Sequence, residues 1–299
     1  MRSYWPTLLL LAAMWGAAYL FIKLAVEDIP PAAMTDIRLL IASVLLSVFL
    51  AARLGIRPAV SELRSAWTPC LVLGIVNAAL PMTLVAWGET HIDSSIAGIA
   101  QASVPIFVAI LGLRFLPHDP LGPSRIAGLA IGIAGVALVT GVHPGGGFWA
   151  VAGTFAVVLS SLSYASGGIY GQLRVQGTPG PVLATGSMIA GALVLLPLAA
   201  VDPPTTAPGA TSLAGLLALA LVPTFLGQLL LFRMLRLFGS RRMSLVTFLM
   251  PGFAVVYGAV LLSEPVSVAA LAGLGLIFAG VILASGERLL GPRVQGEPA

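Results

Sequence analysis

Long apolar stretches alternate with short polar connections along the whole chain. Ten of these stretches are about 20 residues long, the length that an α-helix needs to cross the hydrocarbon core of a bilayer. None of the connections is long enough to form a separate soluble domain. The pattern therefore predicts an all-α integral membrane protein with ten transmembrane helices. The predicted spans are Trp5–Ala25, Ala32–Ala52, Trp67–Trp87, Ser94–Leu113, Gly122–Gly141, Trp149–Leu173, Pro181–Ala200, Leu213–Leu231, Met243–Leu262 and Val266–Gly286.

One stretch of the chain occurs twice. Residues 105–139 and 251–284 both begin with proline, continue through an apolar run and a short polar turn, and reach a glycine-rich apolar run that contains AGVA or AGVI. The repeat predicts two related halves of five helices each. Because five is odd, the second half is expected to cross the membrane upside down, and inverted repeats are typical of carriers that work by alternating access. The predicted divisions are 1–141 and 149–286 for the halves, 142–148 for an external connection and 287–299 for a tail.

The distribution of basic residues predicts the orientation. If the N-terminus is cytoplasmic, 13 of the 15 lysine and arginine residues fall in cytoplasmic segments, and the other two, Lys23 and Arg38, fall within predicted spans. The external connections contain acidic residues, such as Asp28 and Asp202, but no basic ones. Basic residues gather on the cytoplasmic side of membrane proteins, so the sequence predicts an N-in, C-in arrangement with a cytoplasmic tail.

The composition changes the picture by excluding several classes of protein. It is 58% hydrophobic and 9% charged, with a mean hydropathy of +1.03, whereas a soluble domain has about 25% charged residues. The single cysteine, Cys70, excludes an intrachain disulfide and a cysteine-based metal site, and the three histidines show no ligand spacing. We therefore expect the lipid bilayer as surroundings and no metal, no cofactor and no nucleic acid as partners.

The segment MWGAAYLFIKLAVEDIPPAAMTDIRLLIA, residues 14–42, resembles the opening of the EamA-type ten-helix carriers of the drug/metabolite transporter superfamily. In that family a Trp-Gly pair, a lysine near the end of helix one, a proline pair and an arginine in helix two recur. The matching positions here are Trp15, Gly16, Lys23, Pro30, Pro31 and Arg38. Helices four and nine match at Pro105 and Pro251, and helices five and ten match a glycine-rich ending at Gly128, Gly135, Gly273 and Gly280.

One departure from the family pattern lies in the turn after helix four. The family usually has a glutamate there, and this chain has Pro117-His118-Asp119, whereas the second copy retains Glu264. A role of a first-half glutamate at this turn therefore does not carry over to this chain.

The resemblance implies a multi-pass protein of the bacterial inner membrane that exports or exchanges small metabolites, often amino acids. Lipid-like or drug-like substrates are an alternative. A membrane enzyme or a scaffold is less favoured, because no G-x-S-x-G motif occurs and a scaffold needs no inverted repeat. The chain has no Walker A loop, so proton antiport and facilitated diffusion stay open, as do monomer and homodimer.

Polar and aromatic residues in the middle of predicted spans are the candidates for lining a substrate cavity. In hydrocarbon an Asn or Gln needs a hydrogen-bond partner or a wet cavity, so the alternative is an interhelical hydrogen bond, or core packing for the aromatics. The candidates are Trp15, Tyr19, Arg38, Asn77, Gln101, Tyr164, Gln228 and Tyr257.

Charged residues within or beside the spans form a second group of candidates. Arg38 and Lys23 attract a carboxylate substrate, or pair with Asp36 and exchange partners, or belong to a static network. Glu89 and Glu264 are candidates for proton coupling, against the alternative of solvated loop charges.

Pro105 and Pro251 are predicted as paired hinges, because proline bends a helix. The alternative is a pair of fixed kinks that shape the packing of the helices.

Overall fold

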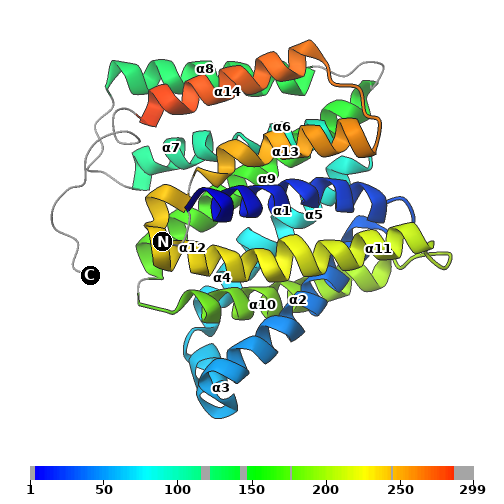
Figure 1. The fold of residues 1–299 in the computed structure, drawn as a ribbon, viewed down its shortest axis with the longest axis vertical. Coiled ribbons are helices and arrows are strands. Elements are labelled where there is room, and N and C mark those ends of the chain that lie inside the picture. The colour runs from blue at the N-terminus through cyan, green and yellow to red at the C-terminus, as the bar shows by residue number, and fades with distance from the viewer. Residues whose placement is uncertain (1–3, 116–121, 142–146, 176, 244, 286–299) are drawn as a thin grey trace.

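A computed structural model of the protein describes residues 4–115, 122–141, 147–175, 177–243 and 245–285, and within them every regular element is a helix (Figure 1). The predicted all-α class is confirmed. The predicted tail at 287–299 and the turn with His118 lie outside the described residues. The elements are α1 (Tyr4–Ala25), α2 (Pro31–Leu54), α3 (Ile56–Ser65), α4 (Trp67–Gly74), η1 (Ile75–Ala79), α5 (Leu80–Glu89), α6 (Ser94–Gln101), α7 (Val104–Phe115), α8 (Pro123–Gly141), α9 (Gly147–Arg174), α10 (Gly180–Val201), α11 (Ala210–Leu219), η2 (Ala220–Leu226), α12 (Gly227–Met243), α13 (Val246–Leu261) and α14 (Val268–Ser285).

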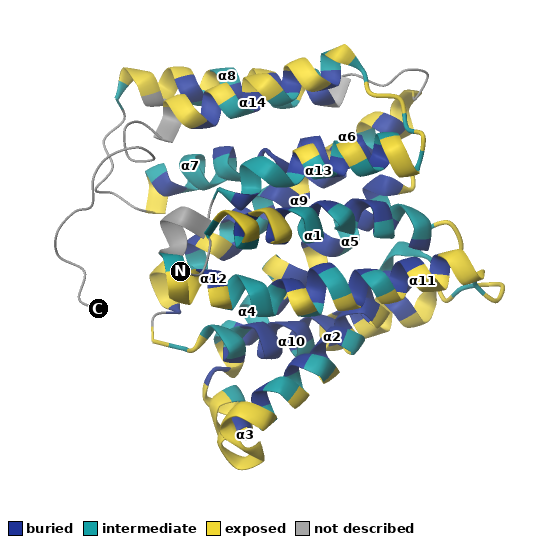
Figure 2. Ribbon diagram, in the orientation of Figure 1, coloured by how far each residue is buried: buried dark blue, intermediate teal, exposed yellow. Residues whose placement is uncertain are grey.

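Among the residues that the structure describes, seven helical stretches are long and apolar enough to cross a membrane. They are Tyr4–Ala25, Pro31–Leu54, Trp67–Glu89, Ser94–Phe115, Gly147–Arg174, Gly180–Val201 and Ala210–Phe238. Three shorter apolar helices, Ile126–Val139, Val246–Leu261 and Val268–Leu283, lie where the sequence predicts the fifth, ninth and tenth spans. Large apolar side chains such as Val48 and Phe155 are exposed on the outside of the bundle, as a surface in contact with lipid requires (Figure 2).

One helix was not predicted. α3 lies in the connection between the second and third spans, and most of its side chains are exposed. Gly55 separates it from α2 with a φ of 86°, a conformation that residues with a side chain rarely adopt. Because α3 is only ten residues long and largely polar on one side, its pattern resembles that of a connection.

α8 and α14 pack against each other along one side of the molecule (Figure 1). A Cβ atom added to Gly135 would lie 2.8 Å from Gly273 O, and one added to Gly280 would lie 2.6 Å from Gly128 O. Gly135 and Gly280 are equivalent in the sequence repeat, and so are Gly128 and Gly273. Each helix therefore presents the same two glycines to the other, as copies related by a twofold axis do.

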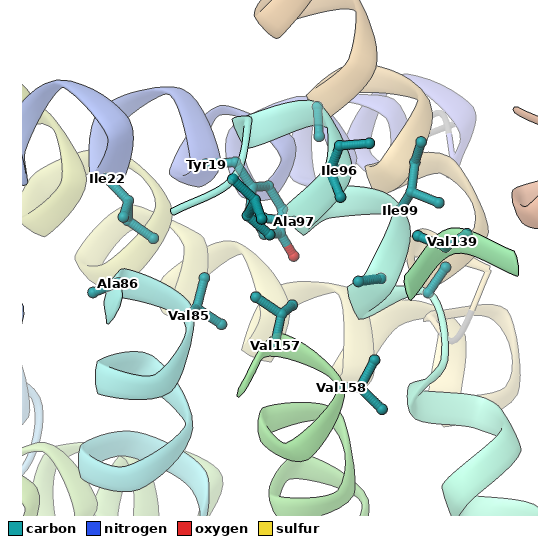
Figure 3. Close-up of a cluster of buried hydrophobic side chains, with 14 of the residues drawn as sticks. Tyr19, Ile22, Val85, Ala86, Ile96, Ala97, Ile99, Val139, Val157 and Val158 are labelled. Carbon is teal, nitrogen blue, oxygen red and sulfur yellow. The ribbon is translucent and has the colours of Figure 1, made fainter. Parts of the chain in front are cut away.

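A buried apolar cluster fills the space between α1, α5, α6 and α9 (Figure 3). Tyr19 of α1, Val85 of α5 and Val157 of α9 are directed into the same space. α5 and α9 approach closely because two glycines meet, and a Cβ on Gly88 would lie 2.8 Å from Gly153 O. This cluster fixes the helices whose inner faces form the cavity described below.

The fourth and ninth predicted spans differ at their prolines. α6 ends at Gln101 and α7 begins at Val104, so the fourth span is interrupted just before Pro105. Pro251 instead lies inside α13, which continues without a break. The helix is therefore interrupted beside the proline in one copy of the repeat only.

The third and eighth predicted spans each contain a π-helical segment near the middle. η1 separates α4 from α5, and η2 separates α11 from α12. A π-helix is rare and is often found at functional sites. The two segments occupy corresponding places in the two halves, and both contribute to the cavity.

Candidate functional site

A cavity of about 300 Å³ lies between helices of both halves. Its wall contains seven of the eight residues that the sequence singled out as candidates. The lining residues are Trp15, Ala18, Tyr19, Ile22, Arg38, Asn77, Met82, Val85, Gln101, Val104, Tyr164, Pro223, Thr224, Gln228, Leu231, Thr247 and Met250. Membrane carriers commonly bind their substrates at such a place, between repeats and beside interrupted helices.

Among the described residues that line the cavity, Arg38 alone carries a charge. It is 7% exposed, and its Nε donates a hydrogen bond of 2.7 Å to Thr224 Oγ1. No described residue accepts a hydrogen bond from its two terminal nitrogens. The partner suggested by the sequence, Asp36, is replaced by Thr224. A guanidinium with two unused nitrogens is suited to a group with two acceptor oxygens, such as a carboxylate.

Thr224 is oriented by the π-helical backbone. Pro223 has no amide hydrogen to donate to Leu219 O four residues earlier, and the Thr224 hydroxyl donates to that carbonyl instead, at 2.7 Å. The hydroxyl oxygen is then left with its lone pairs, one of which accepts from Arg38. η2 thus supplies a hydrogen-bond acceptor at a depth where a charged group without one is costly.

Two amide side chains line the cavity in different ways. Gln101 Oε1 accepts a hydrogen bond of 2.9 Å from Ser160 Oγ, whereas Gln101 Nε2 is buried without a partner among the residues that the structure describes. Asn77 lies on η1 against Gly167 of α9, where an added Cβ would come within 2.8 Å of Asn77 Oδ1. The Gln101 side chain therefore links two helices through its oxygen, and its amide nitrogen is left as a hydrogen-bond donor for a ligand.

Each π-helix receives a hydrogen bond from a helix of the opposite half. Trp15 Nε1 of α1 donates to Pro223 O in η2 at 3.2 Å, and Ser163 Oγ of α9 donates to Val76 O in η1 at 2.7 Å. Ser163 is next to Tyr164, which lines the cavity as Trp15 does. The irregular backbone thus binds Trp15 directly and holds the residue next to Tyr164.

The lining consists largely of pairs that are equivalent in the repeat. These pairs, separated by 146 to 149 residues, are Trp15 and Tyr164, Asn77 and Thr224, Met82 and Gln228, Gln101 and Thr247, and Val104 and Met250. Arg38 departs from the pattern, because its equivalent, Ser187, does not line the cavity. The cavity therefore has two similar sides and one charge.

The structure does not bring Tyr257 into the wall. It lies on α13 two turns beyond Met250, about 10 Å further along the helix axis, and its ring centroid is 6.1 Å from that of Phe253. The sequence pattern gives the face of a helix that a residue occupies but not the depth at which a cavity ends, so this candidate is corrected.

Lys23 holds the end of a helix rather than lining the cavity. Its Nζ donates to Glu89 O at 2.8 Å and to Ile92 O at 2.7 Å. Glu89 is the last residue of α5 and Ile92 lies in the turn that follows it. A cation at a helix C-terminus satisfies unpaired carbonyls and complements the helix dipole. The structural alternative for Lys23 is thereby supported.

Glu264 caps a helix of the opposite half. Its carboxylate accepts hydrogen bonds from Ser94 N at 2.8 Å, from Ser94 Oγ at 3.0 Å and from Ser95 N at 2.9 Å, at the first turn of α6. Anions are stabilised at helix N-termini. Asp93 lies beside this cap, and partial burial together with the charge of Glu264 raises the pKa of Asp93 above its ordinary value.

Asp28, in the first half, makes a similar cap on a helix of the second half. Its Oδ2 accepts hydrogen bonds of 2.8 Å from Gly209 N and from Ser212 Oγ, at the start of α11. These hydrogen bonds lower the pKa of Asp28. Two carboxylates thus join the halves at the end of the molecule where α1 leads into α2.

Two carboxyl groups lack such partners. Glu89, the last residue of α5, is 0% exposed, and neither carboxyl oxygen has a hydrogen-bond partner in the described part of the chain. Asp36 on α2 is 3% exposed, and its Oδ1 is likewise unpaired among those residues. An ionised carboxylate in this condition is strongly unfavourable.

The sequence matches one family twice in succession, over residues 4–141 and over residues 151–286. This chain belongs to the EamA-like transporter family. The resemblance to the drug/metabolite transporter superfamily is thereby confirmed, and the protein is a membrane transporter.

Relatives of this EamA-like transporter carry transporter names. The chain is 30% identical to a "Probable terminal-alkyne amino-acid exporter" of Streptantibioticus cattleyicolor, over 98% of this chain and 96% of the relative. It is 28% identical to the "Uncharacterized inner membrane transporter YedA" of Escherichia coli strain K12, over 93% and 89%. It is 25% identical to a "Probable amino-acid metabolite efflux pump" of Salmonella typhimurium, over 92% of each. The expected multi-pass location in the inner membrane is confirmed.

A solved crystal structure has the same fold as this EamA-like transporter. The TM-score is 0.65 over 95% of this chain and 98% of the solved one, and the sequences are 19% identical. At this identity the likeness concerns the fold alone.

Sequence reasoning missed two kinds of lining residue in this EamA-like transporter. Apolar residues such as Met82 and Met250 have no pattern that separates a cavity wall from packed core. Thr224 could have been found, because it follows Asn77 by 147 residues and so occupies the equivalent place in the second half.

Proposed function

We propose that this transporter is a secondary carrier that exports amino acids or related small carboxylates by alternating access around the central cavity. Its chain crosses the inner membrane ten times as two inverted five-helix repeats, residues 1–141 and 149–286, with both termini in the cytoplasm. The observation that carries the proposal is the buried Arg38, which keeps hydrogen-bond donors unused in the cavity wall.

Three observations support the two-repeat topology. The first turn of α1 and the last turns of α14 lie on the same side of the molecule, as an even number of crossings requires (Figure 1). The reciprocal glycine contacts of α8 and α14 are those of two copies related by a twofold axis. η1 and η2 interrupt corresponding spans of the two halves.

The cavity wall is suited to a small molecule with a carboxylate and an apolar part. Arg38 and Gln101 Nε2 supply donors, and apolar side chains such as Ile22, Met82 and Leu231 supply the rest of the wall. A volume of about 300 Å³ lies at the lower end of the range for ligand pockets. A cationic drug would face Arg38 without compensation, and a neutral lipid would leave Arg38 unpaired, so these substrates are less well supported.

Pro105 and Pro251 are proposed as the hinges of this cycle. Proline removes the hydrogen bond to the carbonyl four residues earlier, which belongs to Gln101 in the first case and to Thr247 in the second. Both of these residues line the cavity. Bending at the prolines would therefore change the wall directly.

Counterflow in proteoliposomes tests the function. Vesicles are loaded with an unlabelled amino acid, and uptake of the labelled form is measured for a panel of neutral, acidic and basic amino acids. We expect saturable uptake by the wild type and a half-saturation concentration at least about tenfold higher for Arg38→Gln, because a hydrogen bond to a charged group contributes about 1.5–3 kcal/mol. Arg53→Gln, at the exposed end of α2, is the matched control and should behave as the wild type.

The outcomes separate the parts of the proposal. If folded wild-type protein shows no counterflow with any amino acid, the amino-acid assignment is wrong. If Arg38→Gln transports as the wild type does, Arg38 has a structural role only.

Labelling of single cysteines tests the orientation. In a Cys70→Ala background, Glu27→Cys is expected to react with an impermeant reagent from the periplasmic side, and Arg57→Cys only after the membrane is opened. The reverse pattern would contradict the N-in arrangement.

A further inference from the structure

Glu89 continues the face of α5 that lines the cavity. Met82, Val85 and Glu89 follow one another at spacings of three and four residues, which places them on one face of the helix. Met82 and Val85 line the cavity, and Glu89 lies one turn beyond them. The carboxyl group therefore lies one turn beyond the cavity wall, at the end of α5.

The surroundings of Glu89 do not stabilise a negative charge by hydrogen bonding. Both carboxyl oxygens lack a partner among the described residues, and the side chain is 0% exposed. Lys23 is within electrostatic range, but its ammonium is engaged by the backbone carbonyls of Glu89 and Ile92. Glu264, also within range, is itself negative and is committed to the cap of α6.

Other titratable groups lie on the elements around Glu89, and none of those in the described part of the chain is hydrogen-bonded to its carboxyl oxygens. Arg38 is hydrogen-bonded to Thr224, and His91 to Thr90. The titratable and charged groups nearby are Tyr19 and Lys23 on α1, Arg38 on α2, Tyr164 on α9, His91 and Asp93 between α5 and α6, and Glu264 after α13.

A neutral carboxyl group fits this environment, whereas an ionised one requires a rearrangement. Burial of an uncompensated carboxylate is much more costly than burial of the protonated acid. Ionisation therefore requires water at this end of the cavity, release of Lys23 from the helix end, or a movement that brings the terminal nitrogens of Arg38 to Glu89. Each of these changes alters the contacts around the cavity.

We propose that Glu89 binds the proton that drives transport. The carboxylate takes one proton from the external water when the outer end is open, and the neutral acid is then buried as the caps close. When the cavity opens to the cytoplasm, the acid returns that proton to water and becomes a carboxylate again, so one proton enters per cycle. This inference rests on the proposed function, because it supplies the driving force for export by the same cavity.

Infrared absorption tests the protonation without any substrate. We expect reconstituted wild-type protein at neutral pH to show the absorption of a buried protonated carboxyl group, and to lose it when the pH is raised. Glu89→Gln should lose the part of this absorption that belongs to Glu89, and Asp36→Asn, a control at another buried carboxyl group, should keep that part. An absorption in Glu89→Gln equal to that of the wild type, or its absence from the wild type, would overturn the proposal.

Accumulation against a gradient tests the coupling. A pH difference of one unit supports an accumulation of up to about tenfold when one proton is exchanged per solute. With labelled alanine, leucine and phenylalanine as probes, we expect this accumulation in the wild type and in Asp36→Asn, and a ratio of about one in Glu89→Gln. Counterflow without a gradient should persist in Glu89→Gln, because the isosteric change leaves the Glu89 backbone carbonyl that binds Lys23 in place.

Three results decide the interpretation of the transport experiment. Wild-type accumulation by Glu89→Gln would overturn the proposal, and loss of coupling in Asp36→Asn alone would assign the proton to Asp36 instead. If no probe shows counterflow even in the wild type, the proposed function fails, and the infrared measurement still decides whether Glu89 binds a proton.

Discussion

In the first half of the molecule α2 carries Arg38 into the cavity wall, whereas at the equivalent position of the second half α10 carries Ser187, which lies outside the wall. Lys23 likewise has the neutral Gln172 as its counterpart. The halves agree far more closely at α8 and α14, where each contributes the same two glycines to the contact.

A duplicated fold keeps its symmetry where the backbones of the two copies are in contact. Where two helix backbones touch, as at Gly135 and Gly280, almost no other residue fits, so both copies retain glycine. A cavity wall imposes no such constraint, because the side chains in it face a ligand rather than their own repeat partners. Both halves therefore keep the same backbone arrangement, whereas only the first half places a charged side chain in the cavity wall.

The largest effect is expected where the symmetry is strictest. In Gly280→Ala the new Cβ would lie 2.5 Å from Gly132 N and 2.6 Å from Gly128 O, and both are backbone atoms that cannot move aside. Overpacking of this kind costs about 2–3 kcal/mol, which corresponds to a melting temperature lower by about 5–10 °C in detergent. Gly135→Ala should cost a similar amount if the two copies are equivalent.

Gly275 provides the control on the same helix. A Cβ at this position would meet nothing within 4 Å, so Gly275→Ala should leave the melting temperature unchanged or raise it slightly, since alanine favours a helix. Equal losses in Gly275→Ala and Gly280→Ala would mean that the glycine contact is not the cause.

A smaller effect is expected at the one charged position. Thr224→Val removes both the acceptor for Arg38 Nε and the donor to Leu219 O, so we expect a loss of about 1–3 kcal/mol in substrate affinity or stability. Half-saturation in counterflow and the melting temperature measure the two contributions, and Thr224→Ser should restore both. Thr83→Val, which removes only a hydroxyl bond of 2.7 Å to Ala79 O, is the control and should have little effect.

The caps between the halves give a smaller effect again. Glu264→Ala removes three hydrogen bonds from the start of α6, and loss of an N-terminal cap costs about 1–2 kcal/mol. We expect a melting temperature lower by about 2–4 °C. Asp202→Ala, at an exposed acidic residue in the connection after α10, should leave it unchanged. If both variants melt alike, the cap does not join the halves.

The smallest effects concern pH. The pKa of Asp93 is raised in the folded protein. The stability that Asp93 contributes is therefore complete below the ordinary aspartate pKa of about 3.9, and it is lost as the pH rises through the raised pKa. Asp93→Asn should therefore raise the melting temperature slightly at pH 7 and not at pH 4.

Asp28 should show the opposite sign. Folding lowers the pKa of Asp28. The stability that Asp28 contributes is therefore present above the ordinary aspartate pKa of about 4, and it is lost only as the pH falls through the lowered pKa. Asp28→Asn should lower the melting temperature at pH 7, and the difference from the wild type should shrink in acid. The same sign for both variants would contradict this account of the two aspartates.

The length of the apolar stretches was enough to predict the all-α class, because a helix that crosses a membrane needs about 20 apolar residues. It could not predict α3, which is short, or the π-helical segments, which shift the hydrogen bonds without changing the apolar pattern. The lining residues with polar groups were predicted at Asn77, Gln101 and Gln228, since such groups are exceptional in a span.

Their roles could not be predicted in the same way. Lys23 and Arg38 are the same kind of feature in the sequence, a basic residue in a span, but one holds a helix end and the other faces the cavity. The difference depends on which carbonyls and hydroxyls lie nearby, and those groups come from segments more than 60 residues away.

Lys23 is also the only lysine in the chain. An amine-reactive reagent therefore has one side-chain target, and in this structure two carbonyls at the end of α5 engage that target. The rate at which Lys23 is modified would report how often it leaves these carbonyls. This rate can be measured in the unaltered protein under any substrate or pH gradient.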